Sequence, residues 1–229
     1  AVLLFIPISD PESGSVTEST VFEASPWSFR HFVLGAIGIF LYVGIEVGIP
    51  GTLIFSLSDT TEKGGGILGN AASIAGTVAA TYWFLMLVGR FTAGFIANLV
   101  SSKTMMLTTS CVGMILVIAA IVLGKSTTIQ MPVISDFVHF SIDWVTVPVA
   151  ALLLVLCGLC TSVMWSSIFN LATEGLGKYT AAASGIFMMM VVGGGVLPLI
   201  QSFIADKSGY LISYIVPLAG LAYLFFYAI

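Results

Sequence analysis

Six long apolar runs, separated by short polar turns, dominate the sequence. Each run approaches or exceeds the 20 or so residues that a helix needs to cross a bilayer, and most charged residues lie between the runs. A spanning helix satisfies its own backbone hydrogen bonds in lipid, whereas a membrane β-barrel needs segments of alternating polarity, which this chain lacks. The pattern therefore predicts an all-α membrane protein, with helices at about 29–57, 67–100, 104–123, 146–173, 181–204 and 211–229.

The composition agrees with this class. Hydrophobic residues make up 58% of the 229 residues and charged residues only 8%, and the mean hydropathy is +1.10. A soluble domain of this size needs more charge, so we expect the lipid bilayer to surround the chain. The net charge of −4 is spread over the loops without a basic patch, which argues against a nucleic-acid partner.

Both ends of the sequence suggest a piece of a longer protein. The chain starts without Met in an apolar stretch, residues 1–7, and stops inside the sixth run. A polar segment, residues 8–27, separates that stretch from the first long run. We expect 1–7 to be the end of a preceding helix, 8–27 to be a linker, and 28–229 to be a six-helix domain whose last helix is truncated.

Polar side chains recur at helical spacing inside two of the runs, which places them on one helix face. Such a stripe either allows close helix packing or lines a wet cavity, and spacing alone does not decide between the two. The stripes are Ser162, Ser166, Asn170 and Glu174 in the fourth run, and Asn70, Ser73, Thr77 and Thr81 in the second.

Glu46 is the most unusual of the intramembrane polar residues. An ionised acid in mid-bilayer costs roughly 2.5–3.5 kcal/mol, so it needs a polar partner, a watery cavity or a proton. Tyr42 lies one turn before it, and Gly44 and Gly48 form a GxxxG packing motif around it. Glu46 is therefore either a functional group or one member of a structural pair, for example with Arg90.

Other motifs give no support for an enzyme. Gly193–Gly195 lack the flanking strand and GKS/T of a nucleotide loop, and we expect them to allow close packing or bending. Cys157 and Cys160 form a single CxxC inside an apolar run, so packing is the simpler interpretation. His31 and His139 lie at a span edge and in a loop, and HExxH and GxSxG are absent. We expect no cofactor, no metal site and no catalytic residue.

Four stretches together resemble a sugar-transporter group of the major facilitator superfamily. They are "FLYVGIEVGI", "YWFLMLVGRFTAGFIAN", "SSIFNLATEGLGKYTAAASG" and "GGGVLPLIQSFIADKSGY", followed by "SYIVP". Jointly, in this order across residues 29–217, they resemble the C-terminal half of the fucose permease and glucose/galactose transporter group.

The resemblance implies a twelve-helix transporter in two six-helix halves, with the substrate held near the midplane between them. Residues 1–7 would end helix 6, residues 8–27 would be the cytoplasmic inter-domain linker, and residues 28–229 would hold helices 7–12. The N-terminal half would be missing. The "EGLGKYT" turn would lie inside the cell and residues 125–145 outside, in the inner membrane of a bacterium.

The resemblance also implies a function and a site. We expect secondary active transport of a monosaccharide by alternating access, with proton symport; sodium coupling, a different small solute and a non-transporting sensor or structural subunit are the alternatives. The position that matches Glu46 in the fucose permease resembles a glutamine, so we interpret Glu46 first as an acceptor for sugar hydroxyls and second as a proton relay. Acids, amides and aromatic faces suit carbohydrate recognition. The expected cavity residues are Tyr42, Glu46, Asn70, Trp165, Asn170 and Gln201, and the expected gate residues are Arg90, Glu174 and Lys178.

Overall fold

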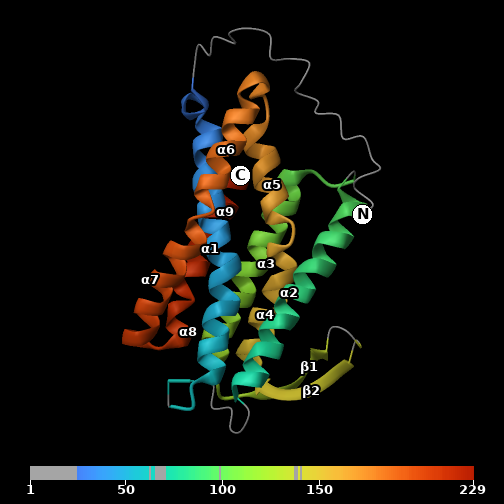
Figure 1. The fold of residues 1–229 in the computed structure, drawn as a ribbon, viewed down its shortest axis with the longest axis vertical. Helices are drawn as coiled ribbons and strands as arrows, with labels where there is room; N and C mark the ends of the chain where they lie inside the picture. The colour runs from blue at the N-terminus through green and yellow to red at the C-terminus, as the bar shows by residue number, and fades with distance from the viewer. Residues whose placement is uncertain (1–24, 62, 65–70, 98, 137–138, 140) are drawn as a thin grey trace, which may run out of the picture.

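The computed structural model describes residues 25–61, 63–64, 71–97, 99–136, 139 and 141–229. The predicted helix end at 1–7, most of the predicted linker and Asn70 lie outside these residues. Within the described part, six helical segments are long and apolar enough to cross a membrane, as predicted. They form an elongated bundle with a β-hairpin at one end and the α5–α6 connection at the other (Figure 1). We call these the hairpin end and the turn end.

The first three spans are single helices: α1 (Arg30–Ser58), α2 (Ala71–Ile96) and α3 (Ser102–Leu123). A short 3-10 turn, η2 (Pro26–Ser28), precedes α1, and the Ser25 hydroxyl accepts a hydrogen bond from the Trp27 N–H at 3.4 Å. Ser101 caps α3 in the same way, by accepting from the Thr104 N–H at 3.2 Å. α3 stops at Gly124, whose φ of +62° suits glycine far better than other residues.

The last three spans are each built from two pieces. They are α4 (Val149–Thr161) with α5 (Met164–Thr173), α6 (Thr180–Met190) with α7 (Gly193–Ser208), and α8 (Tyr210–Ser213) with α9 (Ile215–Ala228). A 3-10 turn, η3 (Gly177–Tyr179), joins α5 to α6.

Two of these breaks, α4–α5 and α8–α9, have local chemical causes. At the α4–α5 break, the Ser162 hydroxyl donates to the Leu159 carbonyl at 2.6 Å and so competes with the helix ladder. At the α8–α9 break, Pro217 lacks the N–H that would bond to the Ser213 carbonyl. Pro198 lies inside α7, which continues through it. Pro50 interrupts nothing, because α1 continues through it to Ser58.

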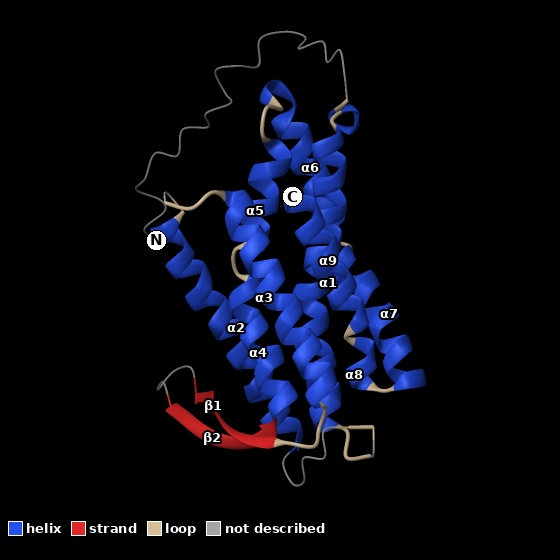
Figure 2. Cartoon of the chain, turned by 180° about the vertical axis from the view of Figure 1, so that it is seen from behind, coloured by secondary structure: helices blue, strands red, loops and turns tan. Residues whose placement is uncertain are grey.

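The segment between the third and fourth predicted helices, which we interpreted as a loop without strands, forms an antiparallel hairpin, so that interpretation was wrong in detail. β1 (Thr128–Asp136) pairs with β2 (Ser141–Pro148), with Met131 opposite Val145. Met131, Val133 and Val147 are buried, and the Ile134 N–H donates to the Thr81 hydroxyl of α2 at 3.3 Å. The hairpin therefore packs on the bundle; Figure 2 shows it as the only strand pair drawn.

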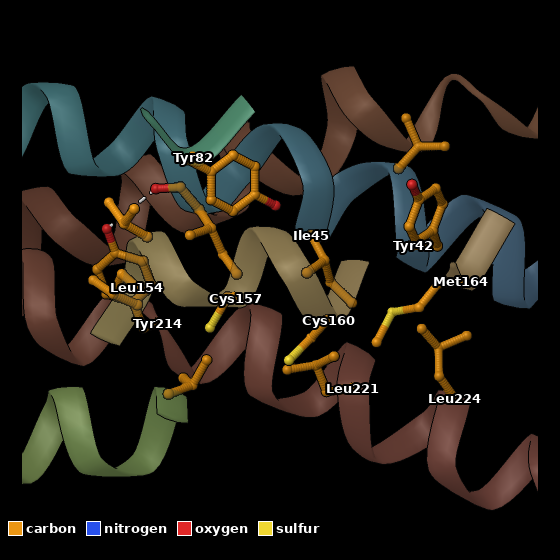
Figure 3. Close-up of a cluster of buried hydrophobic side chains, with 14 of the residues drawn as sticks. Tyr42, Ile45, Tyr82, Leu154, Cys157, Cys160, Met164, Tyr214, Leu221 and Leu224 are labelled. Carbon is orange, nitrogen blue, oxygen red and sulfur yellow. Dashed lines mark hydrogen bonds between the residues drawn. The ribbon is translucent and has the colours of Figure 1, made fainter. Parts of the chain in front are cut away.

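The core lies where α1, α2, α4 and α9 meet. Figure 3 shows Tyr42, Tyr82, Leu154, Tyr214 and Leu221 among its members. Cys157 and Cys160 are buried free thiols in the same core, which confirms their packing role.

Glycines set the close approach of α1 to α7. A methyl group added at Gly48 would lie 2.5 Å from the Gln201 Oε1 atom, and one at Gly44 would overlap Leu197. At Gly193 it would overlap the Phe40 carbonyl of α1. The GxxxG motif and the first of the three consecutive glycines thus pack two helices together, as predicted.

Candidate substrate cavity

An ion pair joins α1 to α2 in the middle of the bundle. The Arg90 Nη2 atom donates to the Glu46 Oε1 atom at 3.1 Å, and the two side chains are 48% and 15% exposed. The same nitrogen lies 3.5 Å from the Tyr42 hydroxyl and 3.6 Å from the Met86 sulfur. The pairing that the sequence left as one of two interpretations of Glu46 is therefore formed, and it compensates a charge that would otherwise be costly in the membrane.

An aromatic pair extends this cluster towards α5. The buried Tyr42 ring meets the Trp165 ring edge to face, with centroids 6.1 Å apart and an interplanar angle of 62°. Such edge contacts are favourable and hold both rings in place. Tyr42 thus contacts the ion pair through its hydroxyl and the indole through its ring.

A cavity of about 540 Å³ opens beside Arg90 and Trp165. Its volume lies within the range of small-molecule sites. It lies between α2, the first turn of α3 and the α4–α5 break, so the break that interrupts the fourth span also shapes the cavity. Its lining is Arg90, Ala93, Gly94, Ala97, Met105, Ser162, Val163, Trp165 and Ser166.

The lining combines one charged group with small and apolar surfaces. Arg90 is the one charged residue among those that line the cavity within the described part of the chain. Ser162 and Ser166 turn their hydroxyl protons to the Leu159 and Val163 carbonyls, at 2.6 and 3.1 Å. Their oxygens keep acceptor capacity on the cavity side. The cavity therefore offers donors from Arg90, acceptors from two serines and the face or edge of an indole.

Two other predicted cavity residues lie elsewhere in the described structure. Asn170 is exposed, and its Nδ2 atom donates to the Ser102 hydroxyl at the start of α3, at 3.2 Å. Gln201 of α7 is 1% exposed, and its side chain lies against Gly48 of α1. Its Nε2 atom has no hydrogen-bond partner within the described part. Of the predicted cavity residues that the structure describes, only Trp165 lines the 540 Å³ cavity, and Tyr42 and Glu46 lie beside its Arg90 wall. The binding roles of Asn170, Gln201 and Asn70 stay predictions.

The three predicted gate residues are distributed over different sites. Arg90 belongs to the Glu46 cluster. Glu174 lines a second cavity of about 350 Å³ at the turn end, together with His31 and Lys103. Lys178 lies 5.4 Å from the centre of the Tyr179 ring. A gate that acts through all three residues together therefore has no geometric support here, and the separate gate roles stay predictions.

The sequence interpretation missed the part that α2 plays in the cavity. Ala93, Gly94 and Ala97 leave the space open beside Arg90, and Met86 lies one turn before it. The spacing of 86, 90, 93 or 94, and 97 is that of one helix face, which was available as a signal. Small residues carry no chemistry of their own, and so they were overlooked.

Known proteins resemble this chain along almost its whole length. The glucose/galactose transporter of Brucella abortus (strain 9-941) is 32% identical over 207 residues, which are 90% of this chain and 44% of the relative. The putative glucose/galactose transporter of Helicobacter pylori (strain J99) is 31% identical over 233 aligned positions, covering 100% of this chain and 50% of the relative. No model of a protein family matches the sequence.

A solved structure shows the same fold. It is the crystal structure of the major facilitator superfamily transporter FucP in the outward conformation, with a TM-score of 0.74 over 99% of this chain and 50% of that one, at 19% identity. The chain is thus similar in sequence to one half of the glucose/galactose transporters and in fold to one half of FucP.

The six apolar spans and these similarities show the architecture. The chain is a multi-pass membrane protein, and the named relatives are transporters rather than enzymes. A relative more distant in sequence is the L-fucose-proton symporter of Escherichia coli, 22% identical over 88% of this chain. The chain spans about half the length of the curated relatives it matches, consistent with the six-helix half predicted from the resemblance.

Proposed function

We propose that the chain is the C-terminal half of a secondary transporter that carries a monosaccharide across the inner membrane of a bacterium. In this proposal residues 1–7 end helix 6, residues 8–27 are the cytoplasmic linker, and residues 28–229 supply helices 7–12. An N-terminal six-helix half completes the substrate site, and the two halves rock about it in alternating access. The names of the curated relatives support a hexose as the substrate.

The observation that carries the proposal is the 540 Å³ cavity with Arg90 and Trp165 in its wall. A pyranose has apolar C–H faces and a ring of hydroxyl groups. The indole can cover a C–H face, while the guanidinium and the serine oxygens can pair with hydroxyls. Glu46 is 15% exposed and lies beside Arg90 without lining the cavity, so it acts on the sugar through Arg90.

Proton symport is the coupling mode that we propose. A relative named as an L-fucose-proton symporter supports it. Glu46 is a carboxylate in mid-membrane and can relay a proton only when its bond to Arg90 opens, so its pairing with Arg90 has priority. Sodium coupling is the alternative, and under it sugar uptake would respond to a sodium gradient rather than to a proton gradient.

The test is solute counterflow in proteoliposomes that contain the full-length transporter. Unlabelled glucose or galactose is loaded into the vesicles, and labelled sugar is added outside. The label should accumulate inside the vesicles, because a carrier exchanges one molecule for the other. A sensor binds without exchange, and binding without counterflow would overturn the transport proposal. Imposed proton and sodium gradients, applied separately, then distinguish the two coupling ions.

A further inference from the structure

Arg90 presents unused hydrogen-bond donors at the cavity. Its contacts with Tyr42, Glu46 and Met86 all use the Nη2 atom. A guanidinium carries five N–H groups, and those on Nε and Nη1 have no partner among the described residues. The side chain is 48% exposed and lines the cavity, so these donors are available to a ligand.

The charge of this donor group is already compensated. Glu46 lies 3.1 Å behind the guanidinium, is mostly buried, and does not line the cavity. No other charged residue lines the cavity within the described part of the chain. A ligand therefore meets a planar fork of N–H donors with close to zero local net charge.

This arrangement separates neutral ligands from anionic ones. A neutral sugar takes hydrogen bonds from the free edge of the guanidinium and leaves the ion pair intact. A carboxylate also fits that fork, since carboxylates pair well with guanidinium groups. It must, however, share Arg90 with Glu46, and two carboxylates a few ångströms apart repel each other strongly at the low effective dielectric of a protein site.

We propose that Arg90 is the residue that binds the sugar hydroxyls, and that Glu46 is a positioning residue which orients Arg90 and excludes sugars with a carboxylate. The proposal rests on the proposed function as a sugar carrier. It makes the substrate class a neutral aldohexose and assigns the discrimination against hexuronates to one carboxylate.

The first experiment needs no mutation. Labelled galactose is bound to the full-length wild-type protein in proteoliposomes. Unlabelled galacturonate and its neutral amide are then compared as competitors that displace the label. The amide should compete about tenfold more effectively or better, because repulsion from Glu46 acts on the acid alone. Equal competition by the acid and the amide would overturn the proposal.

The second experiment changes the selectivity between galacturonate and galactose by mutation. Glu46→Gln should raise the affinity ratio of galacturonate to galactose by about tenfold or more, because Arg90 then lacks its partner charge. Glu46→Asp keeps the charge and should keep the wild-type ratio. The double variant Glu46→Gln/Arg90→Gln should lose the gain, since the uncompensated guanidinium is gone. A role of Glu46 in stability alone would lower both affinities together and leave their ratio unchanged.

The two proposals can fail separately. If the wild-type protein binds neither glucose nor galactose, the proposed function falls and this inference falls with it. If it binds them while Glu46→Gln leaves the ratio unchanged, only the assignment of Glu46 is wrong. If Arg90→Gln leaves galactose affinity unchanged, Arg90 does not contact the sugar.

Discussion

The two members of the Glu46–Arg90 pair depend on each other to different degrees. Glu46 is 15% exposed and Arg90 is 48% exposed, so the carboxylate has far less access to water than the guanidinium. A buried ion that loses its partner pays its full desolvation cost, whereas a half-exposed ion is solvated instead. The pair should therefore respond asymmetrically to mutation.

Removal of the arginine should be the more damaging change. Arg90→Gln leaves Glu46 without a counter-ion and should destabilise the protein by about 2.5–3.5 kcal/mol, the cost of an isolated acid at this depth. Glu46→Gln should cost clearly less, and Glu46→Gln/Arg90→Gln should recover most of the loss from Arg90→Gln. Thermal unfolding of the full-length protein in detergent measures all three. Equal losses for the two single variants would contradict this account of the pair.

Trp165 gives a prediction about affinity rather than stability. Trp165→Ala removes an aromatic face from the cavity wall and should weaken sugar binding roughly tenfold, or about 1.4 kcal/mol. Trp165→Phe keeps a smaller ring and should lose less. Trp144→Ala is the matched control, because Trp144 lies exposed on β2 away from the cavity lining. Equilibrium binding of labelled sugar decides the matter, and an unaffected Trp165→Ala variant would remove the indole from the site.

At the scale of elements, the contact between α1 and α7 is the tightest helix packing described above. Gly44 and Gly48 have α7 side chains where their own Cβ atoms would be, whereas a Cβ atom at Gly51 meets nothing within 4 Å. Three glycines on one helix therefore differ in the space around them, which makes α1 its own control.

Alanine substitutions along α1 should give opposite results. Gly44→Ala forces Leu197 and the backbones apart and should cost about 1–3 kcal/mol, as overpacking does. Gly51→Ala should be neutral or stabilise by up to about 1 kcal/mol, because alanine favours the helix over glycine. Unfolding temperatures of the two variants provide the comparison. If Gly44→Ala were as stable as Gly51→Ala, the close approach of α1 to α7 would be wrong.

A hydrogen bond between described residues ties the hairpin to α2. Thr81→Val keeps the shape of the side chain but removes the acceptor for the Ile134 N–H, at a cost of about 1 kcal/mol or more. Thr77→Val is the control, because the Thr77 hydroxyl bonds only to the Ile74 carbonyl of its own helix. Hydrogen exchange at β1 should accelerate in the first variant alone. Unchanged exchange in both would show that the hairpin is held by its buried side chains.

For the whole molecule, orientation in the membrane is the prediction with the widest consequences. The resemblance places residues 125–145 outside and the "EGLGKYT" turn inside. In a cysteine-free background, Asp143→Cys should react with a membrane-impermeant maleimide in intact cells. Lys178→Cys should react only after the membrane is permeabilised. The reverse pattern would invert the proposed topology.

The sequence predicted the architecture better than the site, for a physical reason. Apolar length decides which segments span the membrane, and all six spans were found. Helix periodicity shows which residues share a face but not which neighbour that face meets. Asn170 and Gln201 were therefore grouped with Glu46, although one contacts Ser102 and the other lies against Gly48.

Arg90 shows the same limit from the other side. The sequence named it both as a possible partner of Glu46 and as a gate residue, and spacing within α2 did not decide between the two. The contact with Glu46 on α1 shows that the pair forms. The hairpin was missed because its alternating residues, such as Met131 and Val133, are too few to stand out beside runs of 20 apolar residues. Contacts between elements decide both cases, and spacing within one element does not contain that information.

The attachment of the hairpin to α2 has a practical consequence. α2 carries Arg90, and β1 is bonded to α2 through Thr81, so a tilt of this helix carries the strands along. A fluorophore or spin label at solvent-exposed Ile142 would consequently act as an external gauge of that tilt. Substrate-driven rearrangements deep in the membrane would then be readable from the surface, without any probe near the bound sugar.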